Sequence, residues 1–310
     1  MNKKTLLFTI FSLMGLLAVT GNAAHAGLFR DRADQGAELE LDEESTSGSV
    51  ALPTGAKLLK DIAYGEAKAQ KMDVYLPAHA DHAPVILMVH GGAWRFGDKA
   101  ASQVVDNKAT RWVAQGFIFI SINYRMLPKA DVLTQADDVA RALAAAQSRA
   151  AAWGGDPAKF ILMGHSAGAH LVALLSAAPT RAQAQGAHPW LGTVALDSAA
   201  LDAVKTMQSR HYRLYNKAFG KDEAFWKSAS PFHVLNATAT PMLLVCSTTR
   251  QDKPCDQADV FAAKAAVLGV RTEVSGQALS HKEVNQKLGL PGAYTDTVER
   301  FMQSLVAGHR

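Results

Sequence analysis

The chain has 310 residues, 48% of which are hydrophobic, and a formal net charge of +4. This length and composition suit one globular α/β domain with a large core. Because the charge is small and no basic run is interleaved with aromatic residues, nucleic-acid binding has no support.

The first 26 residues have the pattern of a secretory signal peptide. Lys3 and Lys4 precede an apolar stretch from Leu6 to Val19, and Ala24 and Ala26 mark a small-residue cleavage site. The stretch is too short for a comfortable membrane span, and no cysteine follows the cleavage site to carry a lipid. We therefore predict a periplasmic or secreted protein without a membrane anchor. Its mature chain begins at Gly27, and without the two lysines its net charge is about +2.

The remaining chain divides into a leader and one domain. Residues 27–56 are polar and of mixed charge, which predicts a flexible leader. Residues 57–310 alternate between strand-like and helix-like segments, as in a mainly parallel sheet with helical crossovers. Within them, the aromatic-rich stretch at about 201–231 predicts a small cap insertion. Its aromatic side chains either line a substrate pocket or only dock helices onto the sheet.

The oxyanion loop is predicted where the apolar run 85–89 leads into His90-Gly91-Gly92-Ala93-Trp94. A His-Gly-Gly loop of this kind supplies backbone N–H donors to an oxyanion, together with the residue that follows the nucleophile. We expect those donors to be the amides of Gly92, Ala93 and Ala167. The His90 ring is predicted to pack beneath the loop, and Trp94 either walls the substrate pocket or anchors the loop.

Two further apolar strands and a helix follow this loop in the chain. Residues 117–122 predict a buried strand, and the alanine-rich stretch 132–153 predicts a long amphipathic helix. The apolar run 160–163 then leads into the pentapeptide Gly164-His165-Ser166-Ala167-Gly168, and helical residues come after it. A Gly-x-Ser-x-Gly pentapeptide between a strand and a helix is a nucleophile elbow, which predicts Ser166 as the catalytic nucleophile.

The predicted general base is His281. It follows a strand at 271–275 and precedes a helical stretch at 283–288, near the end of the chain. This is where the histidine belongs when the chain order is serine, acid, histidine.

From about Lys57 to Val306 the chain resembles an α/β-hydrolase of the bacterial esterase and lipase group. Within that group it is similar to the branch with a His-Gly-Gly-x-Trp oxyanion loop, which includes kynurenine formamidases and feruloyl-type esterases. The resemblance implies a mostly parallel central sheet flanked by helices. It rests on the oxyanion loop, the elbow and four further segments: Asp61-Ile62-Ala63-Tyr64-Gly65, Asp73-Val74-Tyr75-Leu76-Pro77, Asn123-Tyr124-Arg125 and Gly154-Gly155-Asp156-Pro157.

The chain departs from the family pattern at the acid. Aligned without gaps on Pro254, the expected acid position falls on Arg250, which has only donors and cannot accept a hydrogen bond from the base. A slip of two residues in the loop makes Asp252 the predicted acid. Three alternatives stay open, and they are Asp256, Asp259 and, at the end of the preceding strand, Asp197.

Cys246 and Cys255 are the two cysteines of the chain, and they flank the predicted acid. Because an exported protein meets an oxidising compartment, we predict a disulfide between them. The alternatives are two reduced thiols or a metal site, and no cluster of partner ligands favours a metal.

These residues together predict a serine esterase that cleaves small soluble esters through Ser166, Asp252 and His281, with no metal or organic cofactor. The first alternative is an amidase similar to kynurenine formamidase. The second is a non-catalytic envelope binding protein that has kept the fold. The natural ester, its acyl length and the oligomeric state are left open.

Overall fold

The computed structural model describes residues 50–308. The predicted signal peptide, and residues 27–49 of the predicted leader, lie outside the described residues. Val50, Leu52 and Ala56, in the described end of that leader, are packed against the apolar core on one face of the sheet.

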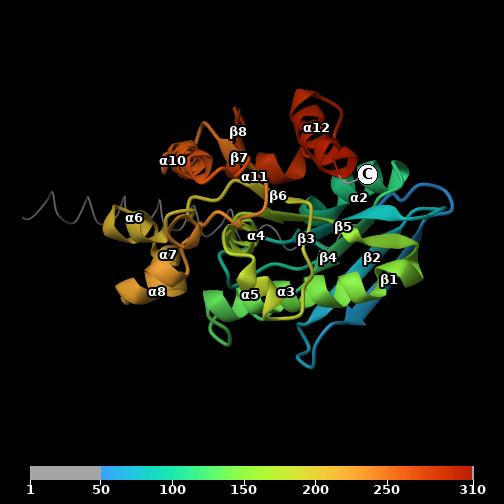
Figure 1. The fold of residues 1–310 in the computed structure, drawn as a ribbon, viewed down its shortest axis with the longest axis horizontal. Coiled ribbons are helices and arrows are strands. Elements are labelled where there is room, and N and C mark those ends of the chain that lie inside the picture. Colours follow the sequence, from blue (N-terminus) through green and yellow to red (C-terminus); the bar gives the residue numbers. More distant parts are fainter. Residues whose placement is uncertain (1–49, 309–310) are drawn as a thin grey trace, which may run out of the picture.

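Eight strands form one sheet in the order β1-β2-β4-β3-β5-β6-β7-β8 (Figure 1). β2 runs antiparallel to both β1 and β4, and the other neighbours are parallel. The parallel strands β4, β6 and β7 are buried along their whole length, which explains their nearly continuous apolar sequences. The strands are β1 (Lys57–Ala63), β2 (Lys71–Leu76), β3 (Ala83–Val89), β4 (Ile118–Ile122), β5 (Gly155–His165), β6 (Gly192–Leu196), β7 (Met242–Ser247) and β8 (Thr272–Gln277).

Helices cover both faces of the sheet, and each face has its own apolar core (Figure 1). One core includes side chains of α3, α4, α5 and α10, and the other includes side chains of α2, α11 and α12. The bounds of these helices are α2 (Ser102–Ala114), α3 (Val132–Arg149), α4 (Ala167–Ala177), α5 (Thr180–Gln183), α10 (Pro254–Val267), α11 (His281–Gln286) and α12 (Ala293–Ala307).

Two helices differ in extent from the sequence prediction. The helix predicted over 132–153 is α-helical only to Arg149, and a 3₁₀ turn at Ala150–Trp153 completes it. The helix predicted over 283–288 begins two residues earlier, at His281. Its start is set by a capping box in which Ser280 and Glu283 each accept a backbone N–H of the other.

Between β6 and β7 the chain forms four short helices at one end of the molecule (Figure 1). They are α6 (Ala203–Gln208), α7 (Arg213–Phe219), α8 (Glu223–Ser228) and α9 (Pro231–Val234). This segment corresponds to the predicted insertion at about 201–231. Within residues 50–308, no helix has both the length and the apolar character needed to cross a bilayer.

Candidate active site

Ser166 lies on a sharp turn between β5 and α4, with φ 54° and ψ −115°. Few L-residues adopt a positive φ, so the surrounding contacts must hold this conformation. The Ser166 N–H donates to the Leu196 carbonyl at 2.9 Å. A Cβ at Gly168 would lie 2.2 Å from the Val89 carbonyl oxygen, so only glycine lets α4 start this close to β3.

His281 connects Ser166 to a buried carboxylate. The Ser166 hydroxyl donates to His281 Nε2 at 2.9 Å, and His281 Nδ1 donates to Asp197 Oδ2 at 2.6 Å. Ser166 follows β5, Asp197 follows β6 and His281 follows β8, so all three lie at the carboxyl edge of the parallel strands. In this arrangement the histidine can take a proton from the serine hydroxyl, while the carboxylate fixes its tautomer.

Asp197 is fully buried and hydrogen-bonded on both carboxylate oxygens. Its Oδ1 accepts from the Ser247 N–H at 2.7 Å, and its Oδ2 accepts from Arg250 Nη1 at 2.8 Å as well as from His281. Burial by itself raises the pKa of Asp197. The hydrogen bond from His281 and the charge of Arg250 outweigh this effect and hold the pKa well below its usual range. Asp197 is therefore ionised at neutral pH.

The prediction that Asp252 is the acid is wrong in this structure, because Asp252 is paired with Arg250 instead. Arg250 donates from Nε to Asp252 Oδ1 at 2.9 Å and from Nη2 to Asp252 Oδ2 at 2.5 Å. Among the described residues, the carboxylate bonded to His281 is that of Asp197, which the sequence offered only as an alternative. The other two alternatives, Asp256 and Asp259, lie in α10.

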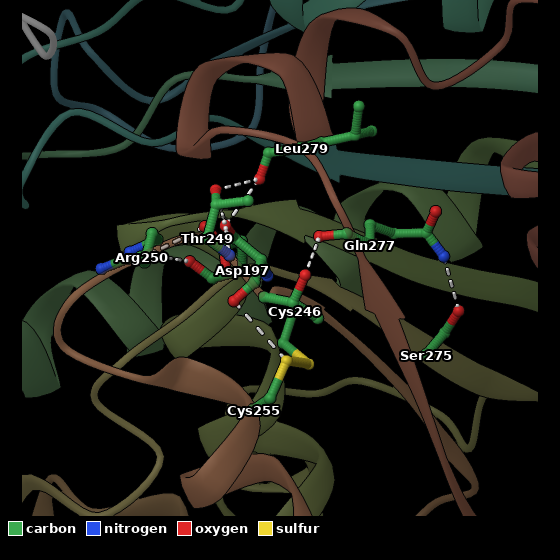
Figure 2. Close-up of a disulfide and its surroundings, with 10 residues drawn as sticks. Asp197, Cys246, Thr249, Arg250, Cys255, Ser275, Gln277 and Leu279 are labelled. Atoms are coloured by element: carbon green, nitrogen blue, oxygen red, sulfur yellow. Dashed lines mark hydrogen bonds and ion pairs between the residues drawn. A yellow bond between two sulfur atoms is a disulfide. The ribbon is translucent and has the colours of Figure 1, made fainter.

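Arg250 occupies the place where the family pattern expects the acid, and it joins the carboxylates of Asp197 and Asp252. Figure 2 shows Arg250 beside Asp197. Arg250 Nη1 also donates to the Asp197 carbonyl at 3.1 Å and lies 2.9 Å from His281 Nδ1. His281 Nδ1 carries the proton that it donates to Asp197, so it has no lone pair to accept a hydrogen bond from Arg250. Arg250 Nη1 therefore donates to Asp197 and not to His281. One signal in the sequence could have identified Asp197 as the acid. Asp197 directly follows the buried strand 193–196, while the loop expected to carry the acid has an arginine at that position.

The predicted oxyanion loop turns tightly after β3. Gly92 has φ 103°, and a Cβ there would lie 2.2 Å from the Phe96 carbonyl oxygen. Ala93 and Trp94 also have positive φ values of 51° and 59°. Of the three predicted donor residues, Ala93 and Ala167 line the cavity that contains Ser166, whereas Gly92 is not among the lining residues.

His90 lies beneath this loop, as the sequence predicts. Its side chain is fully buried, stacks on Tyr124 with ring centroids 4.6 Å apart, and donates from Nδ1 to the Gly91 carbonyl at 2.7 Å. Tyr124 in turn donates from its hydroxyl to the His90 carbonyl at 3.0 Å. These contacts support the loop from below and leave His90 away from the cavity lining.

Trp94 connects the oxyanion loop to the insertion. Its indole N–H donates to His170 Nδ1 at 3.3 Å, and its ring packs edge-on against Phe219 of α7 at 5.1 Å between centroids. His170 Nε2 donates to the Ala229 carbonyl at 2.7 Å. Because Trp94 also lines the Ser166 cavity, it both walls the pocket and anchors the loop.

The cavity above Ser166 has a volume of about 280 Å³. One wall comes from the oxyanion loop and the start of α4, and another comes from α7 and the residues before it. The insertion contributes Tyr212, Leu214 and Tyr215 to the lining. At least these three side chains therefore face the cavity.

Acidification should destabilise the protein through His170. Burial lowers the pKa of His170 to about 4, against 6.5 for an exposed imidazole. Between these values the unfolded chain binds a proton that the folded protein does not. The free energy of unfolding therefore has its full value above pH 6.5 and decreases as the pH falls below it. At pH 4 the decrease due to His170 is about 3 kcal/mol.

Urea unfolding of the protein and of His170→Gln between pH 7 and pH 4 tests this expectation. The variant should show a shallower dependence of unfolding free energy on pH, while His79→Gln, at an exposed position, should keep the slope. An unchanged slope in His170→Gln would contradict the prediction.

The predicted disulfide between Cys246 and Cys255 is present, with the two Cα atoms 5.2 Å apart (Figure 2). It joins the end of β7 to the first turn of α10 and so closes the loop that carries Arg250 and Asp252. Ser247 and Thr249 in this loop donate to the Leu279 carbonyl at 2.6 and 3.1 Å. The loop is thereby tied to the segment that leads to His281.

Replacing both cysteines by serine should lower the free energy of unfolding by about 2–3 kcal/mol. The bridge spans a sequence separation of 9 residues, and the estimate is the chain entropy that such a closed loop removes from the unfolded state. Chemical denaturation of the oxidised protein, the reduced protein and the double variant measures it. The reduced protein should match the variant, and equal stability of all three would contradict the expectation.

Within residues 50–308, no group of three or more His, Cys, Asp or Glu side chains is placed to hold a metal ion. The polar groups around Ser166 are instead bonded to one another, in the series described above.

Comparison with a solved structure identifies the class of fold. A truncated carbohydrate esterase from gut microbiota superposes with a TM-score of 0.72 at 19% sequence identity, covering 83% of this chain and 99% of that one. Together with the eight-stranded sheet and its flanking helices, this confirms the predicted α/β-hydrolase fold.

The BD-FAE family model matches residues 72–265, which is more than half of the chain, so the chain belongs to the BD-FAE family. It is 32% identical to the kynurenine formamidase of Danio rerio over 130 residues, which is 42% of each protein. It is 26% identical to isoprenylcysteine alpha-carbonyl methylesterase of Arabidopsis thaliana over 233 residues, 69% of this chain and 54% of that protein. The chain thus spans about half the length of the curated relatives it matches.

Proposed function

We propose that the protein is an exported serine hydrolase that cleaves small carboxylic esters, with Ser166 as nucleophile, His281 as general base and Asp197 as the acid. The observation that carries this proposal is the continuous series of hydrogen bonds from Ser166 through His281 to Asp197, which opens into a cavity. Kinship with proteins named as esterases supports the same reaction class.

In the first half of the reaction, Ser166 Oγ attacks the ester carbonyl carbon and gives its proton to His281 Nε2. The tetrahedral oxyanion is stabilised by the N–H groups of Ala93 and Ala167, and Gly92 shapes the loop that carries Ala93. Asp197 stabilises the imidazolium without taking its proton. When the carbon–oxygen bond breaks, His281 protonates the leaving alcohol, and an acyl group stays on Ser166.

In the second half, water replaces the alcohol. His281 takes a proton from the water as its oxygen attacks the acyl carbon, and the same N–H groups stabilise the second oxyanion. Collapse of this intermediate returns the proton to Ser166 Oγ and releases the carboxylic acid. Every proton is accounted for by His281, so the cycle needs no cofactor.

The substrate class follows from the cavity and the N-terminal sequence. A cavity of about 280 Å³ suits a short acyl or alcohol group better than a long chain. The signal-like sequence of residues 1–26 and the Cys246–Cys255 bridge both favour an oxidising compartment outside the cytoplasm.

A second candidate is a formamidase, favoured by the 32% identity to a kynurenine formamidase. The same residues would cleave an N-formyl amide, with His281 protonating the leaving amine. Export favours the esterase over the formamidase, because an exported protein is separated from an N-formyl amide substrate inside the cell.

Hydrolysis of p-nitrophenyl acetate, butyrate and octanoate, compared with N-formylkynurenine, tests the proposal. We expect turnover of the esters, faster for acetate and butyrate than for octanoate. Faster turnover of N-formylkynurenine would favour the formamidase. Absence of turnover on all four would contradict both and would favour the non-catalytic binding protein.

A further inference from the structure

A second cavity, of about 450 Å³, adjoins the one that contains Ser166. The two cavities share five lining residues, among them Tyr212, Tyr215 and Asp252. The two cavities are therefore neighbours that meet at these shared side chains.

Three cations line the second cavity and none of them lines the first. Lys205 comes from α6, Arg210 follows that helix, and Lys253 directly precedes α10. All three are exposed, and within residues 50–308 none of their side chains makes an ion pair with a carboxylate. By contrast, Lys99 is held between two carboxylates, with its Nζ 2.7 Å from Asp73 and 3.2 Å from Asp61.

The carboxylates of this cavity do not cancel the cations. Asp252 is one of the two, and it shares the single charge of Arg250 with Asp197. Asp256 is the other, so three cations face two carboxylates and the lining keeps an excess of one positive charge. A cavity lined by one excess sign of charge concentrates ligands of the opposite sign.

We propose that the second cavity is a subsite for an anionic group, so that the preferred substrates are esters that carry a carboxylate a few bonds from the ester carbonyl. This inference rests on the proposed esterase function, and it adds the substrate class. The carboxylate lies among Lys205, Arg210 and Lys253 while the ester carbon lies at Ser166.

Two matched substrate pairs test the subsite, one for each side of the ester. Monomethyl adipate is compared with its neutral amide analogue, methyl adipamate, for an anion on the acyl side. 4-Acetoxybenzoate is compared with 4-acetoxybenzamide for an anion on the alcohol side. In at least one pair, we expect kcat/KM for the anion to exceed that for the amide by about tenfold at low salt.

Screening and charge removal supply the controls. Raising the salt from about 20 mM to about 500 mM should collapse the preference, because the Debye length shrinks to a few ångström. Lys205→Met, Arg210→Met and Lys253→Met should each reduce the ratio of anion to amide, and the triple variant should bring it close to one. Lys227→Met, which removes a charge from the same insertion but outside both cavities, should keep the ratio.

Binding separates this proposal from the proposed function. Adipate should bind the Ser166→Ala variant in calorimetry, and adipamide should bind at least tenfold more weakly. Ratios near one in both substrate pairs, or equal binding of adipate and adipamide, would overturn the subsite even if neutral esters are hydrolysed. If no ester is hydrolysed, the esterase proposal fails, and the binding comparison still decides the subsite.

Discussion

Asp197→Asn is expected to lower kcat for ester hydrolysis by about three to four orders of magnitude. The amide would offer His281 Nδ1 a donor or a neutral acceptor in place of the ionised oxygen that now lies 2.6 Å away. The imidazole would then lose both its fixed tautomer and the charge that stabilises its protonated form. Steady-state kinetics on p-nitrophenyl butyrate measures the loss.

Asp252→Asn is the matched control for this result. Asp252 has the same side chain and lies in the same cavity, but its two hydrogen bonds go to Arg250 and not to His281. We expect a loss of less than about tenfold, through a less firmly held Arg250. If Asp252→Asn proved far more damaging than Asp197→Asn, the original sequence prediction would be right and the present assignment wrong.

Ser166→Ala should lower kcat by about a million-fold, close to complete loss in a practical assay. The variant removes the atom that forms the acyl-enzyme, while a methyl group fits the same strained position at φ 54°. Kinetics on the same ester measures the effect, and thermal unfolding checks that the fold is retained.

Ser198→Ala serves as the control for Ser166→Ala. Ser198 also lines the Ser166 cavity, but its hydroxyl accepts from the Ala200 N–H at 3.2 Å and is not bonded to His281. Its replacement should change kcat by a few-fold at most. Comparable turnover by Ser166→Ala and the unchanged protein would exclude Ser166 as nucleophile.

Local patterns were sufficient to predict the buried strands β3, β4 and β6, and to single out Ser166 and His281 as candidate residues. The buried strands are continuous apolar runs, and the elbow and the oxyanion loop are short segments whose shape depends mainly on their own residues. The start of α11 was missed by two residues, although the Ser280–Glu283 capping box was visible as Ser-x-x-Glu.

The acid could not be predicted in the same way, because it depends on which neighbouring loop reaches His281. The family pattern gives the position of the acid by its spacing within one loop. That spacing falls on Arg250, and a slip of two residues then favours Asp252. In the structure, the carboxylate comes from the adjacent strand β6, and Arg250 of the β7 loop holds it by a contact across 53 residues. Such a contact between two loops leaves no spacing rule in the sequence.

The roles of the insertion also depend on contacts between distant segments. Trp94 meets Phe219 and His170 only once the chain between β6 and β7 folds over the oxyanion loop. From the sequence, pocket and packing roles for these aromatic residues were equally acceptable. The structure gives Trp94 both roles at once.

The most direct test of the central claim, that Ser166 is an activated nucleophile, is labelling with a fluorophosphonate followed by peptide mapping. These reagents phosphonylate a serine only when a neighbouring base activates its hydroxyl. We predict one phosphonyl group per chain, on the peptide that contains Ser166, with loss of ester hydrolysis in step with labelling and much slower labelling in Asp197→Asn. Hydrolysis that persists in fully treated protein, or a label on a different residue, would contradict the account.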